Sequence, residues 1–134
     1  MKTFLGLLSF VFILNSCGNK NDFQKAENAF DAGRSFIEGC LQGDFKKAEF
    51  YMLKDENNIS RLKKLETDYD HKSEKEKVQY HDASIVILDD TETDENTHII
   101  NYKNSYDNIA RKVKVVKQQN DWLVDFKYTF DGNL

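Results

Sequence analysis

The sequence predicts an α+β domain, in which N-terminal helices pack on a four-stranded antiparallel sheet. Two periods indicate this fold. From residue 23 to residue 69, apolar side chains recur every three or four positions, as on one face of a helix. After Val78 they recur at every second position in short runs, as in strands with one buried face. Helices followed by a meander of strands favour an α+β arrangement, whose helices cover the apolar face of the sheet.

The first helix is expected to begin after Asn21, which can cap it, and to carry an apolar stripe over residues 23–41. Gly43 ends this helix, because glycine readily adopts the left-handed conformation found at helix C-termini. Asp44 can then cap a second, shorter helix over residues 45–53. The sequence therefore predicts two helices joined by a tight corner.

A third helix is expected after a short connection. Asn57 or Asn58 can cap it, and its apolar positions lie within residues 59–69. The run that follows, residues 70–77, is almost wholly charged or polar. Because its opposite charges are interspersed, it is interpreted as a solvated helix end or a loop and not as a binding segment.

Four strands are expected in the second half, over residues 82–88, 97–104, 109–118 and 122–130. The last has the clearest pattern, because apolar residues at even positions from Trp122 to Phe130 alternate with more polar ones. Turns are expected over residues 89–96, 105–108 and 119–121. Strands joined by such short turns predict an antiparallel meander.

The N-terminus has the features of an export signal. One lysine precedes an apolar run, residues 3–14, which is too short to span a bilayer but fits the hydrophobic region of a signal peptide. An ordinary secretory signal cut near Ser16 or Gly18 is one interpretation. The stretch Leu14-Asn15-Ser16-Cys17 favours another, because it resembles the lipobox of bacterial lipoproteins, although that family rarely has an asparagine at the second place.

The lipobox resemblance implies a lipid anchor. Residues 1–16 would be removed as the signal peptide, and Cys17 would carry a diacylglyceryl thioether and an acylated amine, so that palmitate labels it. Two or more acyl chains give stable membrane attachment. Residues 17–21 would form the tether of a domain over residues 22–134. Gly18 replaces the aspartate that resembles an inner-membrane retention signal, which favours the outer membrane of the bacterial cell envelope.

Charge and cysteine content limit the partners. The chain carries a formal charge of −4, so it has no electrostatic reason to bind nucleic acid. In the basic segment 111–117 the charges largely alternate with valines, which is typical of a strand with one exposed face. If Cys17 is lipidated, Cys40 has no disulfide partner, and its place on the apolar face of the first helix predicts that it is packed in the core.

Several features together resemble a nuclear transport factor 2-like (cystatin-like) roll. They are the long first helix, the Gly43-Asp44-Phe45 corner with Ala48 behind it, the polar third helix, and four strands ending in Trp122-Leu123-Val124. The likeness covers about residues 22–130, and small bacterial lipoproteins carry uncharacterised domains of this type. It implies a curved sheet that wraps the first helix into a cone, with any ligand at the mouth of the cone.

No cofactor or metal is expected. The three histidines lack the spacing of a metal site; they are His71, His81 and His98. Residues 90–94 superficially resemble a calcium loop, but Glu95 stands where such a loop needs glycine, so a hairpin turn is favoured. All six glycines are isolated, which argues against a phosphate-binding loop.

The candidate pocket residues are side chains that can enter the cone and carry acid–base chemistry: Tyr51, Tyr80, His98 and Tyr102, with Asp125 if the last strand bulges. No paired catalytic motif accompanies them, so a binding domain is favoured over an enzyme. Three functions stay open in this order: an envelope lipoprotein that binds a protein partner or forms a homodimer, a small-molecule carrier or sensor using the cone, and an isomerase or hydrolase.

Overall fold

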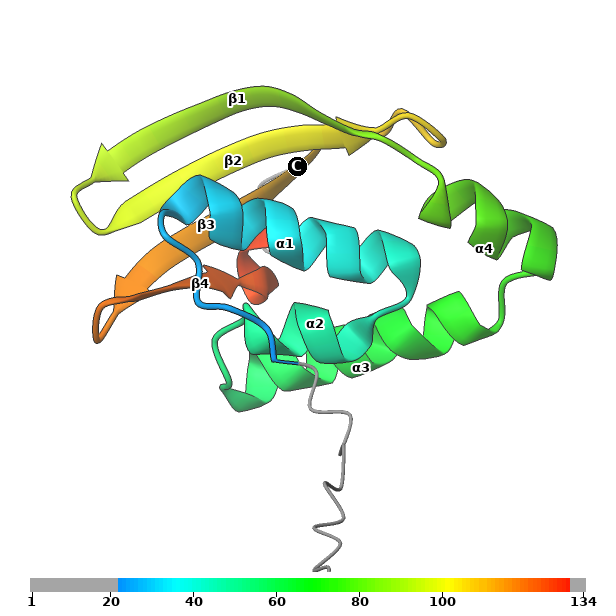
Figure 1. Ribbon diagram of the computed structural model, residues 1–134, viewed down its shortest axis with the longest axis horizontal. Coiled ribbons are helices and arrows are strands. Elements are labelled where there is room, and N and C mark those ends of the chain that lie inside the picture. The colour runs from blue at the N-terminus through cyan, green and yellow to red at the C-terminus, as the bar shows by residue number, and fades with distance from the viewer. Residues whose placement is uncertain (1–21, 131–134) are drawn as a thin grey trace, which may run out of the picture.

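The computed structural model describes residues 22–130; Cys17, the predicted signal peptide and the tether lie outside this range. Figure 1 shows a four-stranded sheet with helices against one of its faces. In chain order the elements are α1 (Ala29–Gln42), α2 (Phe45–Phe50), α3 (Glu56–Asp70), α4 (Glu74–His81), β1 (Ile85–Asp94), β2 (Thr97–Asn104), β3 (Arg111–Gln118), β4 (Asp121–Asp125) and the 3-10 helix η1 (Phe126–Phe130). The predicted α+β class, with helices and a four-stranded antiparallel sheet, is confirmed.

The core lies between α1 and the inner face of the sheet. The strands are hydrogen-bonded in chain order, and each neighbouring pair is antiparallel. The inner face supplies side chains with no solvent exposure: Ile100, Val113, Val115 and Val124. A methyl group added at Gly33 would lie 2.5 Å from Cδ1 of Ile100, so glycine at this position lets α1 approach β2 closely. The apolar core is continuous, as a domain that folds by itself requires.

Helix α1 begins later than predicted. Its N-cap is Asn28, whose side chain accepts a hydrogen bond from the amide of Asp31, so the expected start after Asn21 is wrong. The preceding segment is held by other contacts. The carbonyl of Gln24 accepts a hydrogen bond from the Tyr51 hydroxyl at 2.7 Å, and the ring of Phe23 packs on that of Phe50. These tertiary contacts outweigh the local helical pattern.

The polar middle of the chain is more ordered than predicted. Asp55 caps α3, and the expected caps Asn57 and Asn58 lie inside that helix. Within the run 70–77, Ser73 and Glu76 form a reciprocal capping box, which starts the additional helix α4. The serine and the glutamate three residues later were the sequence signal for this helix.

Several element boundaries also differ from the predictions. α2 ends at Phe50 and not at residue 53, β1 begins at Ile85 and not at residue 82, and β3 begins at Arg111 and not at residue 109. β2 has its predicted bounds, but β1 continues through the expected turn to Asp94, so that only Glu95 and Asn96 connect it to β2. β4 ends at Asp125, and the chain continues as η1 instead of as a strand to Phe130. The amide of Lys127 donates a hydrogen bond to the Asn58 side chain at 2.7 Å and is therefore not available for pairing with β3.

The outer edge of β4 is not left open. Val124 donates a backbone hydrogen bond to Tyr51 and accepts one from Leu53, and Met52 forms a parallel bridge with Val124. This pairing protects the edge against association with other strands. In the part of the chain that the structure describes, no helix is long and apolar enough to cross a bilayer.

Candidate functional site

A cavity of about 320 Å³ opens at the end of the domain where β2 ends and β3 begins. Its walls come from the C-terminal half of α1, the end of α3, α4 and η1. Most of the wall is apolar, from Phe36, Ile37, Leu41, Leu65, Phe126 and Phe130. Phe126 holds two of these rings in place, because its ring centroid lies 4.9 Å from that of Phe36 and 5.0 Å from that of Phe130. The cavity is therefore a preformed apolar space.

An ion pair between Asp107 and Arg111 forms the polar end of the cavity. Nη2 of Arg111 lies 2.7 Å from Oδ2 of Asp107, and Nη1 lies 3.1 Å from Oδ1. The Asn104 side chain accepts hydrogen bonds from the amides of Tyr106 and Asp107, which fixes the turn that carries the carboxylate. This pair is a bidentate interaction with its backbone locked in place.

Partial burial alone would raise the pKa of Asp107. Hydrogen bonds from Arg111 and from the amide of Ile109 outweigh this effect and lower the pKa to about 2. The same contacts with Asp107 raise the pKa of Arg111. Both groups are therefore charged throughout the physiological range.

Tyr80 and Lys72 lie beside this ion pair. The Tyr80 ring packs edge-on against Tyr106, with centroids 4.8 Å apart, and Nζ of Lys72 lies 4.8 Å from the Tyr80 ring centroid. Burial and the negative charge of Asp107 raise the pKa of Tyr80. A cation over an aromatic ring is held by the ring's quadrupole, so Lys72 has a defined place at the cavity.

Tyr102 and Cys40 complete the wall. Tyr102 is 7% exposed, and no residue of 22–130 forms a hydrogen bond with its hydroxyl. The oxygen is not sealed in the core but reaches the cavity, since Oδ1 of Asn101 is the one fully buried side-chain oxygen or nitrogen without a partner in the described range. Cys40 is half-buried and faces the cavity as well as the core. Burial raises the pKa of the Tyr102 hydroxyl and of the Cys40 thiol. Both side chains are therefore neutral near pH 7.

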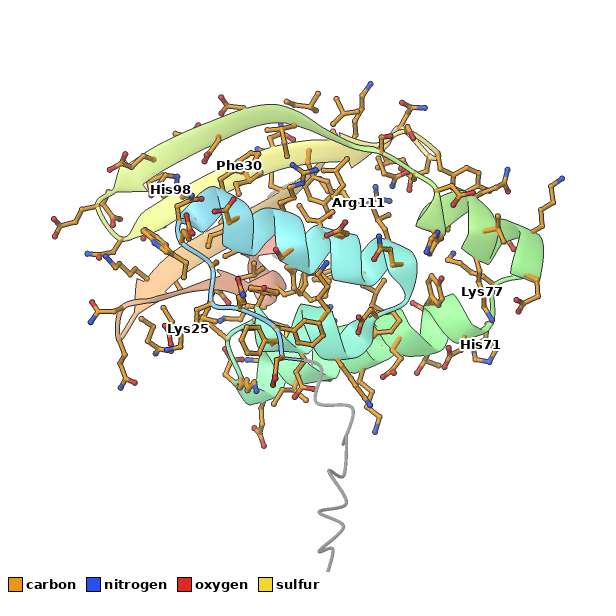
Figure 2. The ribbon with its side chains drawn as sticks, in the orientation of Figure 1. Lys25, Phe30, His71, Lys77, His98 and Arg111 are labelled. Carbon is orange, nitrogen blue, oxygen red and sulfur yellow. The ribbon has the colours of Figure 1, made fainter. Side chains whose placement is uncertain are left out.

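The predicted pocket residues separate into two groups. Tyr80 and Tyr102 line the cavity. Tyr51 donates its hydroxyl to the Gln24 carbonyl, away from the cavity, and Asp125 is paired with Lys127. Nδ1 of His98 lies 3.0 Å from the Asp90 carboxylate, and Figure 2 shows His98 near the β1–β2 turn, with Arg111 toward the other end of the sheet.

The sequence analysis missed Arg111 and Lys72, which line the cavity, and Asp107, which pairs with Arg111. A signal for Arg111 was present: it has the same parity as Val113 and Val115, and alternate residues of a strand share a face. The arginine was instead grouped with the exposed charges of its strand. Asp107 and Lys72 lie in connections, where no period indicates which way a side chain faces.

Metal-binding groups are not formed by the described residues: no three side chains of the histidine, cysteine, aspartate or glutamate type converge there. The acidic segment compared with a calcium loop lies mostly within strand β1. Comparisons of the chain with models of known protein families, with curated proteins and with solved structures found no match in any of the three.

Proposed function

We propose that this protein is a lipid-anchored bacterial envelope lipoprotein whose domain binds a small, mostly apolar molecule and is not an enzyme. The cavity beside α1 carries this proposal. At about 320 Å³, it lies within the size range of small-molecule sites and has their typical lining, an apolar wall with a few polar groups. A core filled by side chains would have favoured a protein partner instead.

The acidities around the cavity support binding and not catalysis. A general acid or base works best when its pKa is near the working pH. Here the pKa values of Tyr80, Tyr102 and Cys40 are raised, and that of Asp107 is lowered to about 2. Each of these pKa values is shifted further from 7, so none of these groups is suited to transfer a proton at pH 7.

The arrangement of helices and strands supports a nuclear transport factor 2-like (cystatin-like) roll as the finer fold. In such a roll the mouth of the cone corresponds to the place where the cavity opens, next to the C-terminal half of the first helix. The lipid anchor is proposed from the sequence around Cys17, which lies outside the described residues. It predicts that Cys17→Ala abolishes palmitate labelling and releases the protein from the membrane fraction. Labelling of that variant would contradict the anchor.

Native mass spectrometry tests the binding function. The chain from Gly18 onward, purified gently from its own host, should retain extra mass of a few hundred daltons. Leu65→Trp replaces an aliphatic side chain of the cavity wall with a large indole ring, so it should fill the space and remove this extra mass. Ile59→Trp is the control, because Ile59 lies on the same helix, away from the cavity, with 44% exposure. A wild-type chain that is bare, or that carries only a protein partner or a second copy, would contradict the proposal.

A further inference from the structure

We infer that the molecule held in the cavity is a small apolar monocarboxylate, whose carboxylate lies among Tyr102, Arg111 and Lys72. This inference rests on the proposed binding function and specifies the chemistry of the ligand. It draws on three independent features: a hydroxyl that reaches the cavity and has no partner in the described chain, unused donors on a fixed guanidinium, and a lysine without a carboxylate.

The Tyr102 hydroxyl is available to a ligand in the cavity. Its residue is more than nine-tenths buried and lines the cavity, and no residue within the described range accepts or donates a hydrogen bond at that oxygen. The oxygen itself reaches the cavity, so it can form a hydrogen bond with a molecule bound there. A ligand acceptor at this position would satisfy it.

The guanidinium of Arg111 has unused hydrogen-bond donors. Of its five N–H groups, Nη1 uses two, to Asp107 and to the Ile109 carbonyl, and Nη2 uses one, to Asp107. The Nε–H and the second N–H of Nη2 have no acceptor among residues 22–130. These two groups point from the same edge of the planar guanidinium, and a carboxylate accepts such a pair with both oxygens.

Lys72 brings a positive charge to the cavity without a close ion-pair partner in the described chain. Asp107 neutralises Arg111, whereas Lys72 has no carboxylate within ion-pair distance among the described side chains. Asp68 also borders the cavity, but its side chain is exposed, so water screens its charge. Lys72 is half-buried, so water screens its charge less than that of Asp68. A single carboxylate matches this excess.

The rest of the ligand must be apolar and compact. The wall opposite the polar end is aromatic and aliphatic, including Phe36, Phe126 and Phe130. The volume of about 320 Å³ is near the lower end of the range for small-molecule sites. An aryl or medium-length alkyl chain fits this description, and a polar body such as a sugar does not.

Calorimetry with matched probes tests the inference on the chain from Gly18 onward. The probes are 2-naphthoate and 2-naphthamide, then octanoate and octanamide; each pair has the same shape and differs in charge. The acid of at least one pair should bind about 10-fold more tightly than its amide, because hydrogen bonds to a charged acceptor are roughly twice as strong as neutral ones.

Three variants locate the effect. Lys72→Gln should weaken the acid roughly 5-fold to 10-fold and leave the amide unchanged, since it removes a charge beside the bound carboxylate. Tyr102→Phe keeps the buried ring and should weaken both probes roughly 10-fold, because either accepts a hydrogen bond from the hydroxyl. Lys75→Gln removes an exposed charge from α4, away from the cavity, and should change neither affinity.

The outcomes separate the two proposals. Equal affinity for acid and amide would overturn the monocarboxylate and leave the binding function standing. So would a failure of all four probes at millimolar concentration when the purified protein carries extra mass. Failure of the probes together with a bare protein would overturn both proposals. If Lys75→Gln weakened binding of the acid as much as Lys72→Gln did, the preference for the acid would come from long-range attraction and not from Lys72 beside the carboxylate. That result would overturn the inference.

Discussion

The Asn58 cluster, where α3 meets β4 and η1, and the Arg111 cluster, at the cavity, contain the same kinds of groups but differ in how their donors are used. Asn58 has no solvent exposure; its amide nitrogen donates to Asp55 and Asp125, and its oxygen accepts from the Lys127 amide. Every polar atom of that side chain is occupied. At the cavity, a tyrosine hydroxyl and one edge of a guanidinium are not.

The difference shows which buried polar groups hold the fold and which indicate a ligand. A buried polar group whose hydrogen-bond partners all belong to the chain stabilises the fold, because its removal leaves those partners without hydrogen bonds. A cavity-facing group without a partner in the described chain gains nothing from it and is available to a ligand. Mutations at the two clusters should therefore affect stability and binding in opposite proportions.

Asn58→Ala should give the largest effect. It removes the acceptor of the Lys127 amide and a donor to Asp125. We expect a loss of roughly 2 to 4 kcal/mol in the free energy of unfolding, measured by urea titration. Asn57→Ala, at the exposed neighbouring position, should cost less than about 0.5 kcal/mol. Similar losses for the two variants would remove the distinction between the clusters.

Arg111→Met tests the ion pair between Arg111 and Asp107 in the cavity cluster. The change keeps most of the apolar volume but leaves the carboxylate of Asp107 without its cation. We expect a loss of about 2 kcal/mol in urea unfolding, less than for a completely buried pair because both side chains reach solvent. Lys112→Met, on the outer face of the same strand, should be nearly neutral. A neutral Arg111→Met would mean that the pair adds nothing to the fold.

The pH dependence of the free energy of unfolding tests the same ion pair between Asp107 and Arg111. The folded-state pKa of Asp107 is about 2, below the value of about 3.9 for an unfolded chain. A lowered pKa stabilises the fold above the unfolded value, and this contribution disappears as pH falls from about 4 to about 2. The stability gap between wild type and Arg111→Met should therefore narrow by roughly 1 kcal/mol across that range, allowing for screening. A constant gap would contradict the assigned shift.

Much of the fold was predictable because it depends on local period. β2 was predicted to its terminal residues, and the Gly43–Asp44 corner joins α1 and α2 as expected. The errors lie where distant side chains override the local pattern. The apolar alternation that predicted a strand to Phe130 could not include the hydrogen bond from the Lys127 amide to Asn58, which is 69 residues away in the sequence.

The cavity was predictable only in part. Tyr80 and Tyr102 were among the expected pocket residues and line it. Arg111 could have been found from strand parity. The Asp107–Arg111 pair depends on a turn held by the Asn104 side chain, and Lys72 depends on the placement of α4. Whether a space stays open between packed elements is set by all of their side chains together, so no local pattern indicates it.

Tyr51 and Tyr102 allow the same comparison with a single hydroxyl group, and the expected effects on stability are the smallest. Tyr51→Phe removes a hydrogen bond to the Gln24 carbonyl and should cost about 1 kcal/mol in urea unfolding. Tyr102→Phe removes a hydroxyl with no partner in the described part of the chain, so its cost should stay within about 0.5 kcal/mol. The two rings are almost equally buried, at 8% and 7% exposure, so the hydroxyl environment is the main difference. An equal cost would mean that the Tyr102 hydroxyl is already satisfied without a ligand, and the main reason for placing a carboxylate there would be lost.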